Sequence, residues 1–190
     1  KYAKKHKNIC LLKNINILNQ CSISCVGSRY PNTAVLQWMD VHLTEIAKND
    51  FVIVSGAARG VDQKAHSCSL RAENPTIAFL PSGLSSVYPR EFQKWEDSIV
   101  QTGGALVSEY HPYQEIMSHH FHERNRMIAS LGLITFVAQA RRRSGSTLTA
   151  RLAIENSKPV AVLPSFPGDK MSEGSLDLLF QGAFPIRDSD

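Results

Sequence analysis

Two turns in this sequence place glycine, serine and arginine directly after a short apolar segment. One turn follows residues 23–26 and the other follows residues 51–55. Glycine lets the backbone approach a ligand closely, and a hydroxyl and a guanidinium both bind phosphate oxygens. If a helix begins at each turn, its free N–H groups add to an anion site. The turns predict a phosphate-rich ligand, with Gly27, Ser28, Arg29, Ser55, Gly56, Arg59 and Gly60 as candidates.

Three later segments carry the same chemistry. A serine–glycine turn follows residues 76–80, an arginine–asparagine pair opens an apolar helix, and three arginines precede a run of hydroxyl residues at 144–147. The last segment is also compatible with a solvated basic loop in which Ser144 or Ser146 caps a helix. Its combination with the other turns favours phosphate binding. The additional candidates are Ser82, Gly83, Arg124, Asn125, Arg143, Ser144, Gly145, Ser146 and Thr147.

Four further polar residues are expected to support the site. Asp62 and His66 are four residues apart and share a helix face. They form either a catalytic carboxylate–imidazole pair or a structural anchor for the loop, and the absence of a nearby nucleophile favours the anchor. Arg126 either helps to bind the anion or is a buried structural arginine paired with a carboxylate such as Glu109.

Metal and cofactor signatures are weak in this sequence. The histidines at 119, 120 and 122 lack an obvious further ligand at zinc-site spacing. Neither a Walker A loop nor the Gly-x-Gly-x-x-Gly fingerprint of dinucleotide binding is present. We expect no metal and no cofactor.

The elements that position these turns alternate regularly along the chain. The expected strands cover residues 22–26, 51–55, 76–80, 105–108, 133–138, 160–163 and 183–187. The expected helices cover residues 32–48, 61–71, 90–102, 122–131, 146–156 and 175–181. Short, apolar, β-branched strands alternating with helices predict an α/β fold. We expect an extended Rossmann-like, doubly wound, mostly parallel sheet with helices on both faces, and ligands at the carboxyl ends of its strands.

Length and composition are typical of a single globular domain. The chain has 190 residues, 43% hydrophobic and 20% charged, with a net charge of +4, which is ordinary for one mildly basic globular domain. Residues 1–20 are expected to be a lead-in segment and residues 21–190 the domain. Four cysteines fit neither a zinc site nor a disulfide framework, and no apolar run approaches membrane-spanning length. A reducing, cytoplasmic location without membrane contact is expected.

The order of these motifs resembles the DNA-processing protein A family (DprA, also called Smf) over roughly residues 21–187. The recurring features appear in sequence as Val26-Gly27-Ser28-Arg29, Ser55-Gly56, Ala58-Arg59-Gly60-Val61-Asp62, His66, Ser82-Gly83-Leu84, Tyr88-Pro89, Ser108-Glu109, Phe121, Arg124-Asn125-Arg126, Arg143-Ser144-Gly145-Ser146 and Gly182-Ala183.

The resemblance implies a Rossmann-like domain that binds single-stranded DNA without sequence preference and helps to load a RecA-type recombinase in natural transformation. It also implies a homodimer without established catalytic activity. Carried over by position, the DNA-contacting arginines are Arg29, Arg59, Arg124 and Arg143. The chain departs from the family pattern at Arg143, where lysine is usual, and at Gln139, where an acidic residue is common.

Two alternatives of another class stay open. The chain also looks like nucleoside-monophosphate phosphoribohydrolases of the LOG type, through His122-Glu123-Arg124 and Gly145-Ser146-Thr147. Those enzymes place a catalytic glutamate two residues after that threonine, where this chain has Thr149. A nucleotide sensor using the same pocket is the other alternative.

Overall fold

One eight-stranded sheet organises the protein. The computed structural model describes residues 10–13 and 15–189. The strand order is β1-β5-β4-β3-β2-β6-β7-β8, and only β1 is antiparallel to its neighbour. The strands are β1 (Cys10–Lys13), β2 (Ser22–Val26), β3 (Val52–Gly56), β4 (Thr76–Phe79), β5 (Ala105–Ser108), β6 (Ile134–Val137), β7 (Val160–Val162) and β8 (Phe184–Pro185). The expected mostly parallel, doubly wound sheet is confirmed.

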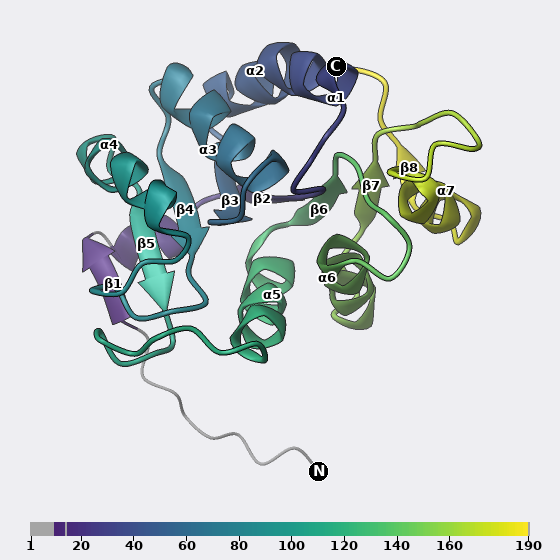
Figure 1. Ribbon diagram of the computed structural model, residues 1–190. Coiled ribbons are helices and arrows are strands. Elements are labelled where there is room, and N and C mark those ends of the chain that lie inside the picture. Colours follow the sequence, from purple (N-terminus) through teal and green to yellow (C-terminus); the bar gives the residue numbers. More distant parts are fainter. Residues whose placement is uncertain (1–9, 14, 190) are drawn as a thin grey trace.

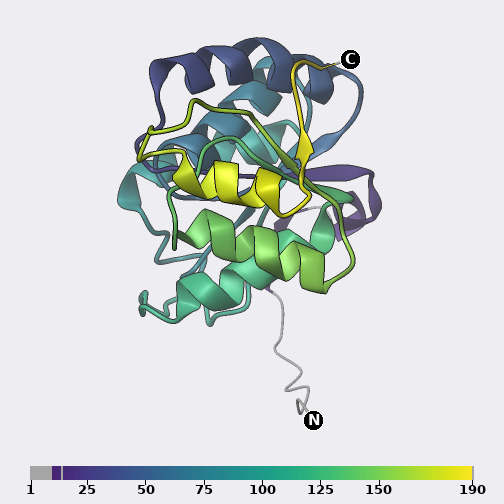
Figure 2. The same cartoon turned by 90° about the vertical axis from the view of Figure 1, so that its right-hand side faces the viewer.

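Helices cover both faces of the sheet, as Figure 1 shows for α1 to α3 above it and α5 and α6 below it. Viewed from the side, α5, α6 and α7 lie in adjacent rows (Figure 2). The helical segments are η1 (Ile15–Asn19), α1 (Thr33–Trp38), η2 (Met39–Leu43), α2 (Thr44–Lys48), α3 (Val61–Arg71), η3 (Arg90–Trp95), α4 (Glu96–Gln101), α5 (His120–Leu131), α6 (Gly145–Glu155) and α7 (Glu173–Phe180).

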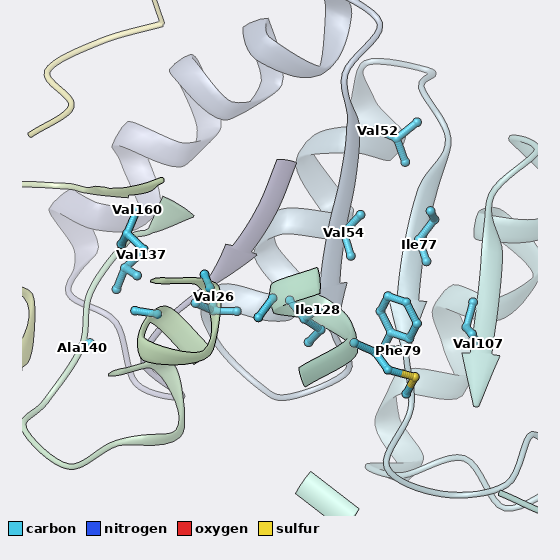
Figure 3. Close-up of a cluster of buried hydrophobic side chains, with 14 of the residues drawn as sticks. Val26, Val52, Val54, Ile77, Phe79, Val107, Ile128, Val137, Ala140 and Val160 are labelled. Atoms are coloured by element: carbon cyan, nitrogen blue, oxygen red, sulfur yellow. The ribbon is translucent and has the colours of Figure 1, made fainter. Parts of the chain in front are cut away.

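The buried strand residues account for the unalternating sequence pattern. Below the sheet, strand valines and Ile77 pack against Ile128 of α5 and the small residues of α6 (Figure 3). Above it, Ile53 and Phe136 pack against Met39, Leu43 and the apolar face of α3. Because both faces are covered, nearly every strand residue is apolar or small.

Three elements differ from the sequence expectation. The helix expected over 32–48 contains a π-helical turn at η2, and the one expected over 90–102 begins as a 3-10 helix at η3. The segment before Cys21, expected to be a lead-in, supplies the edge strand β1 and packs Ile17 into the core. The division of the chain at Cys21 stays a prediction.

The strand order reverses at β2. The chain runs from β2 through β3 and β4 to β5 on one side, then crosses to β6 on the other side of β2. In a doubly wound sheet, such a reversal leaves a crevice outside the carboxyl ends of the two strands. The loops after β2 and β6 are therefore the place to look for a site.

Candidate functional site

A pocket of about 300 Å³ lies at this reversal point. It is lined by the turn after β2, by the start of the β3–α3 segment, by one face of α5 and by the loop that opens α6. The lining includes Gly27, Ser28, Arg29, Asp62, Arg124, Asn125, Arg141, Ser144, Gly145 and Ser146. The structure thus brings together residues from four of the turns that the sequence singled out.

A buried ion pair forms the floor of this pocket. Arg124 and Asp62 are only 5% and 6% exposed, and Arg124 Nη1 lies 3.5 Å from Asp62 Oδ2. The same carboxylate oxygen accepts a hydrogen bond from the Ala58 N–H at 3.3 Å. A Cβ atom at Gly56 would lie 1.3 Å from Arg124 Nη1. Glycine at this strand end is therefore required for the arginine to occupy its place.

Burial governs the electrostatics of this pair. It raises the pKa of Asp62 despite the attraction of Arg124, and it lowers the pKa of Arg124 despite the attraction of Asp62. Both shifts have the same cause, because removal from water disfavours each charged form. The Nε atom of Arg124 is buried and has no hydrogen-bond partner among the described residues. The pair therefore sits in an environment where an added anion interacts strongly.

The turn after β2 is held by backbone contacts. The Ser28 N–H donates to the Gln139 carbonyl at 2.7 Å, and the Ser28 carbonyl accepts from the Val61 N–H at 3.1 Å. Gly60 has a φ of 77°, and a Cβ there would lie 2.4 Å from the Ser28 carbonyl oxygen. These contacts fix the turn between β6 and α3, and they leave the side chain of Arg29 exposed at the pocket mouth.

The helix α6 begins at the opposite wall. Ser144 Oγ accepts from the Thr147 N–H at 3.2 Å, and Thr147 Oγ1 accepts from the Ser144 N–H at 3.0 Å, which makes a capping box. The N–H groups of Gly145 and Ser146, like those in the first turn of any helix, lack a partner four residues back. Free N–H groups of this kind can bind an anion, and both residues line the same pocket as Arg141.

A second hollow of about 410 Å³ adjoins the first and shares Arg29, Tyr30 and Phe121 with it. Tyr30 and Tyr88 are 69% and 43% exposed there. The Arg29 guanidinium lies 5.6 Å from the centre of the Phe121 ring, and the Tyr88 ring meets Phe121 edge-on at 6.1 Å. Flat rings and cations therefore line one continuous surface.

Not every candidate residue reaches the pocket. Ser55 and Ser82 are fully buried and hydrogen-bond with the Cys25 carbonyl and the Tyr88 N–H. Gly83 packs against the backbone of residues 111 and 112. Arg143, which has a φ of 53°, lines a separate hollow of about 140 Å³ between α6 and α7.

Arg59 is present at the second hollow but is already paired. Its Nε atom contacts Glu91 Oε1 of η3. By contrast, Arg29 and Arg141 have no carboxylate within ion-pair distance in the part of the chain that the structure describes. In the central pocket these two arginines are therefore available to a ligand, and Arg90, which is exposed at the second hollow, likewise forms no ion pair with a described carboxylate.

The expected pairing of Asp62 with His66 is wrong. His66 Nε2 lies 2.7 Å from the Gly56 carbonyl, and its Nδ1 lies 2.8 Å from Thr76 Oγ1. Asp62 turns instead to Arg124. The two side chains share the helix α3, but their partners lie on different elements, and helical spacing alone does not reveal this. Burial lowers the pKa of His66 to about 4, so the ring is neutral and donates from Nε2 to the Gly56 carbonyl.

Other polar residues also find structural partners. Arg126 donates to both carboxylate oxygens of Glu109 at 2.5 Å, which is the expected pairing, but its side chain is 50% exposed and the expected burial is wrong. His120 is buried and stacks on Tyr110 with ring centres 3.9 Å apart. Over residues 10–13 and 15–189, no group of three potential ligands could hold a metal, and no helix is long and apolar enough to cross a membrane.

Arg141 was missed as a candidate. It belongs to the three-arginine run, but sequence alone does not say which of the three faces the pocket. The structure separates them, because Arg142 forms a bidentate pair with Asp177 at 2.7 and 2.9 Å and Arg143 lies on the α7 side. The one feature of the sequence that could have separated the three arginines is Asp177 on the following helix, because it is the partner of Arg142.

Comparison with known proteins places the chain in a family. The sequence model of DNA recombination-mediator protein A matches residues 6–190. This chain belongs to that family. It is 34% identical to protein Smf of Escherichia coli over 93% of its length, and 36% identical to DNA processing protein DprA of Bacillus subtilis over 86%. It covers 47% and 55% of those two proteins, about half their length.

Solved structures of two family members have the same fold as this chain. The DprA structure from Streptococcus pneumoniae matches with a TM-score of 0.89 and 32% identity, covering 95% of this chain and 63% of that one. DNA processing protein A from Helicobacter pylori, described with a single-stranded DNA binding mode, matches with a TM-score of 0.87 and 32% identity, covering 95% and 82%. The molybdenum cofactor binding protein of Rippkaea orientalis shares 16% identity over 90% of this chain and 91% of its own, at a TM-score of 0.62, which shows the fold alone.

Proposed function

We propose that this domain binds single-stranded DNA at the reversal point of its sheet. One observation carries the proposal. Two adjoining hollows combine Arg29 and Arg141, which pair with no described carboxylate, with the exposed rings of Tyr30 and Tyr88. Single-strand binders pair a basic groove for phosphates with aromatic side chains on which bases stack. The single-stranded DNA binding of the related H. pylori protein supports the same role.

Each part of the site has a defined task in this proposal. Arg29 and Arg141 contact phosphates from opposite sides of the pocket, and the N–H groups at the start of α6 donate to one phosphate between them. Tyr30 and Tyr88 stack on bases, which must be unpaired to reach them. Arg124 lies beneath, and its charge attracts the phosphate while Asp62 keeps it in position.

Absence of sequence preference follows from the same parts. Phosphate contacts carry no base information, and every base has a face on which a ring can stack. We further propose that the bound strand is passed to a RecA-type recombinase during natural transformation, that the domain works as a homodimer, and that it does so in the cytoplasm. The family membership supports these steps.

The pocket is poorly equipped for hydrolysis of a nucleotide. Thr149, at the place of the catalytic glutamate of LOG-type enzymes, lines the pocket but hydrogen-bonds with the Gly145 carbonyl at 2.9 Å. Among the described residues that line the central pocket, Asp62 is the one carboxylate, and it is engaged by Arg124. We therefore favour a binding protein over an enzyme. Release of free base from a nucleoside monophosphate would contradict this choice.

The test is fluorescence anisotropy with a labelled single strand across a salt series. Replacing Arg29 or Arg141 by alanine should weaken binding equally on unrelated sequences. Each variant should reduce the slope of log K against log salt by about 0.7, the value for one lost phosphate contact on a single strand. Arg187→Ala is the matched control, because that side chain is 93% exposed and lies outside both hollows. Unchanged affinity in both arginine variants would contradict this placement of the site.

A further inference from the structure

A second aromatic and basic element lies beside the pocket, on the loop between β7 and α7 (residues 163–172, here the β7–α7 loop). Phe166 is 86% exposed at this loop, and Lys170 is also exposed. The loop follows a parallel strand, so it sits at the same edge of the sheet as the pocket. One exposed apolar side chain is common on protein surfaces. Phe166 differs from such a residue because its loop lies at the same sheet edge as the pocket and is held there by hydrogen bonds.

The β7–α7 loop is fixed by one aspartate. Asp169 Oδ2 accepts from Ser172 Oγ at 2.7 Å, from Asn32 Nδ2 at 3.0 Å and from Gln139 Nε2 at 3.3 Å, and its Oδ1 accepts from the Met171 N–H at 2.9 Å. These hydrogen bonds lower the pKa of Asp169. The aspartate therefore stays ionised, and the loop is held to the segments that follow β2 and β6.

Arg141 joins the loop to the pocket. Its Nε atom lies 2.8 Å from Met171 Sδ, while the residue also lines the central pocket. The backbone behind it is packed tightly, since a Cβ at Gly174 would lie 2.4 Å from the Arg141 carbonyl oxygen. A phosphate bound by Arg141 would therefore lie beside the β7–α7 loop.

We propose that Phe166 is a further base-stacking site and that Lys170 contacts the adjoining phosphate. The ligand is an unpaired nucleobase on the strand that leaves the central pocket past Arg141, so the inference rests on the proposed function. The binding track then extends from Tyr88 after β4, across Tyr30 after β2, to Phe166 after β7. Strand β7, which the loop of Phe166 follows, is two positions from β2 in the sheet, and neighbouring strands are about 4.8 Å apart.

The test compares Phe166→Ala with the unaltered chain on two labelled single strands, a trinucleotide and a ~20-mer, the longer one exceeding the usual site size of one domain. Loss of one stacked base should weaken binding of the longer strand about fivefold or more and leave the trinucleotide unchanged. Phe166→Trp should retain the affinity. Lys170→Ala should reduce the salt slope by about 0.7 on the longer strand alone.

Two controls separate this inference from the proposed function. Leu133→Ala removes an apolar side chain that is 56% exposed at the start of β6, the opposite edge of the sheet, and should change nothing. A longer strand with abasic positions should bind the Phe166→Ala variant and the unaltered chain alike. If the unaltered chain binds the ~20-mer and Phe166→Ala binds it equally well, the stacking site is refuted while the proposed function stands. If the unaltered chain binds no single strand, the proposed function itself fails.

Discussion

Removing the carboxylate of Asp62 should destabilise the protein strongly. Arg124 and Asp62 are both nearly excluded from water, and the guanidinium Nε already lacks a hydrogen-bond partner among the described residues. Asp62→Ala leaves the arginine buried without its counter-charge. Breaking a buried pair in this way costs about 3–5 kcal/mol of unfolding free energy. The Ala58 N–H loses its acceptor as well.

The pair as a whole is not expected to stabilise the fold. Burial disfavours both charges, as the raised pKa of Asp62 and the lowered pKa of Arg124 indicate. Replacing both residues together, as Asp62→Leu with Arg124→Met, should therefore recover most of the loss, because apolar side chains of similar volume fill the same space. The double variant should nevertheless bind single-stranded DNA poorly, since the pocket floor has lost its cation.

Urea unfolding measures these differences. With a slope of about 2 kcal/mol per M, a loss of 3–5 kcal/mol shifts the midpoint by about 2 M. Glu45→Ala is the control, because its ion pair with Lys48 joins side chains that are 52% and 56% exposed, and it should cost about 0.5 kcal/mol or less. A loss below about 1 kcal/mol in Asp62→Ala, or a double variant no more stable than the single one, would show that the two charges are not buried against each other.

Three other perturbations follow from the same geometry. His66 has a pKa of about 4 in the folded protein and about 6.5 in the unfolded chain, so the unfolded chain binds an extra proton between these pH values. Acidification from about pH 6.5 to about pH 4 should therefore lower the unfolding free energy of the unaltered protein by about 3 kcal/mol more than that of His66→Gln, as measured by urea titration. Equal losses in the two proteins would show that the ring is not buried in its neutral form. Gly56→Ala should lower the melting temperature and abolish DNA binding, because its Cβ clashes with Arg124. Gly145→Ala is the control and should melt like the unaltered chain, since its Cβ meets nothing closer than 3.6 Å. Equal melting temperatures of the two variants would argue against the clash. Glu91→Gln releases Arg59 for phosphate and should tighten single-strand binding at low salt, and a weaker affinity would mean that the ion pair instead builds the site.

Most of the fold could be predicted because its strands are buried on both faces. The apolar run at 22–26 and the helix at 61–71 agree with β2 and α3 to the residue. The edge strand β1 could not be predicted so easily, since an antiparallel partner four residues long leaves a weak pattern in a lysine- and asparagine-rich segment. The π-helical turn at η2 likewise leaves the helical spacing of apolar residues almost unchanged.

The site was harder to predict than the fold. Glycines and arginines at strand ends marked the correct edge, but side-chain partners decide which of them are available. Ser55 turns inward to the Cys25 carbonyl, 30 residues away in sequence, and Arg59 is held by Glu91, 32 residues away. Such long-range partners have no local pattern. The stacking role proposed for Phe166 depends in the same way on Asp169 joining three separate segments.

The most direct measurement of the central claim is the affinity of the whole chain for a labelled single strand and for the matching duplex, each over a salt series. We expect tighter binding of the single strand, equal affinity for unrelated sequences, and a log–log salt slope of about −0.7 for each phosphate bound. Equal or tighter binding of the duplex, or a single-strand affinity that does not change with salt, would contradict a site in which exposed arginines bind phosphates and exposed rings stack on unpaired bases.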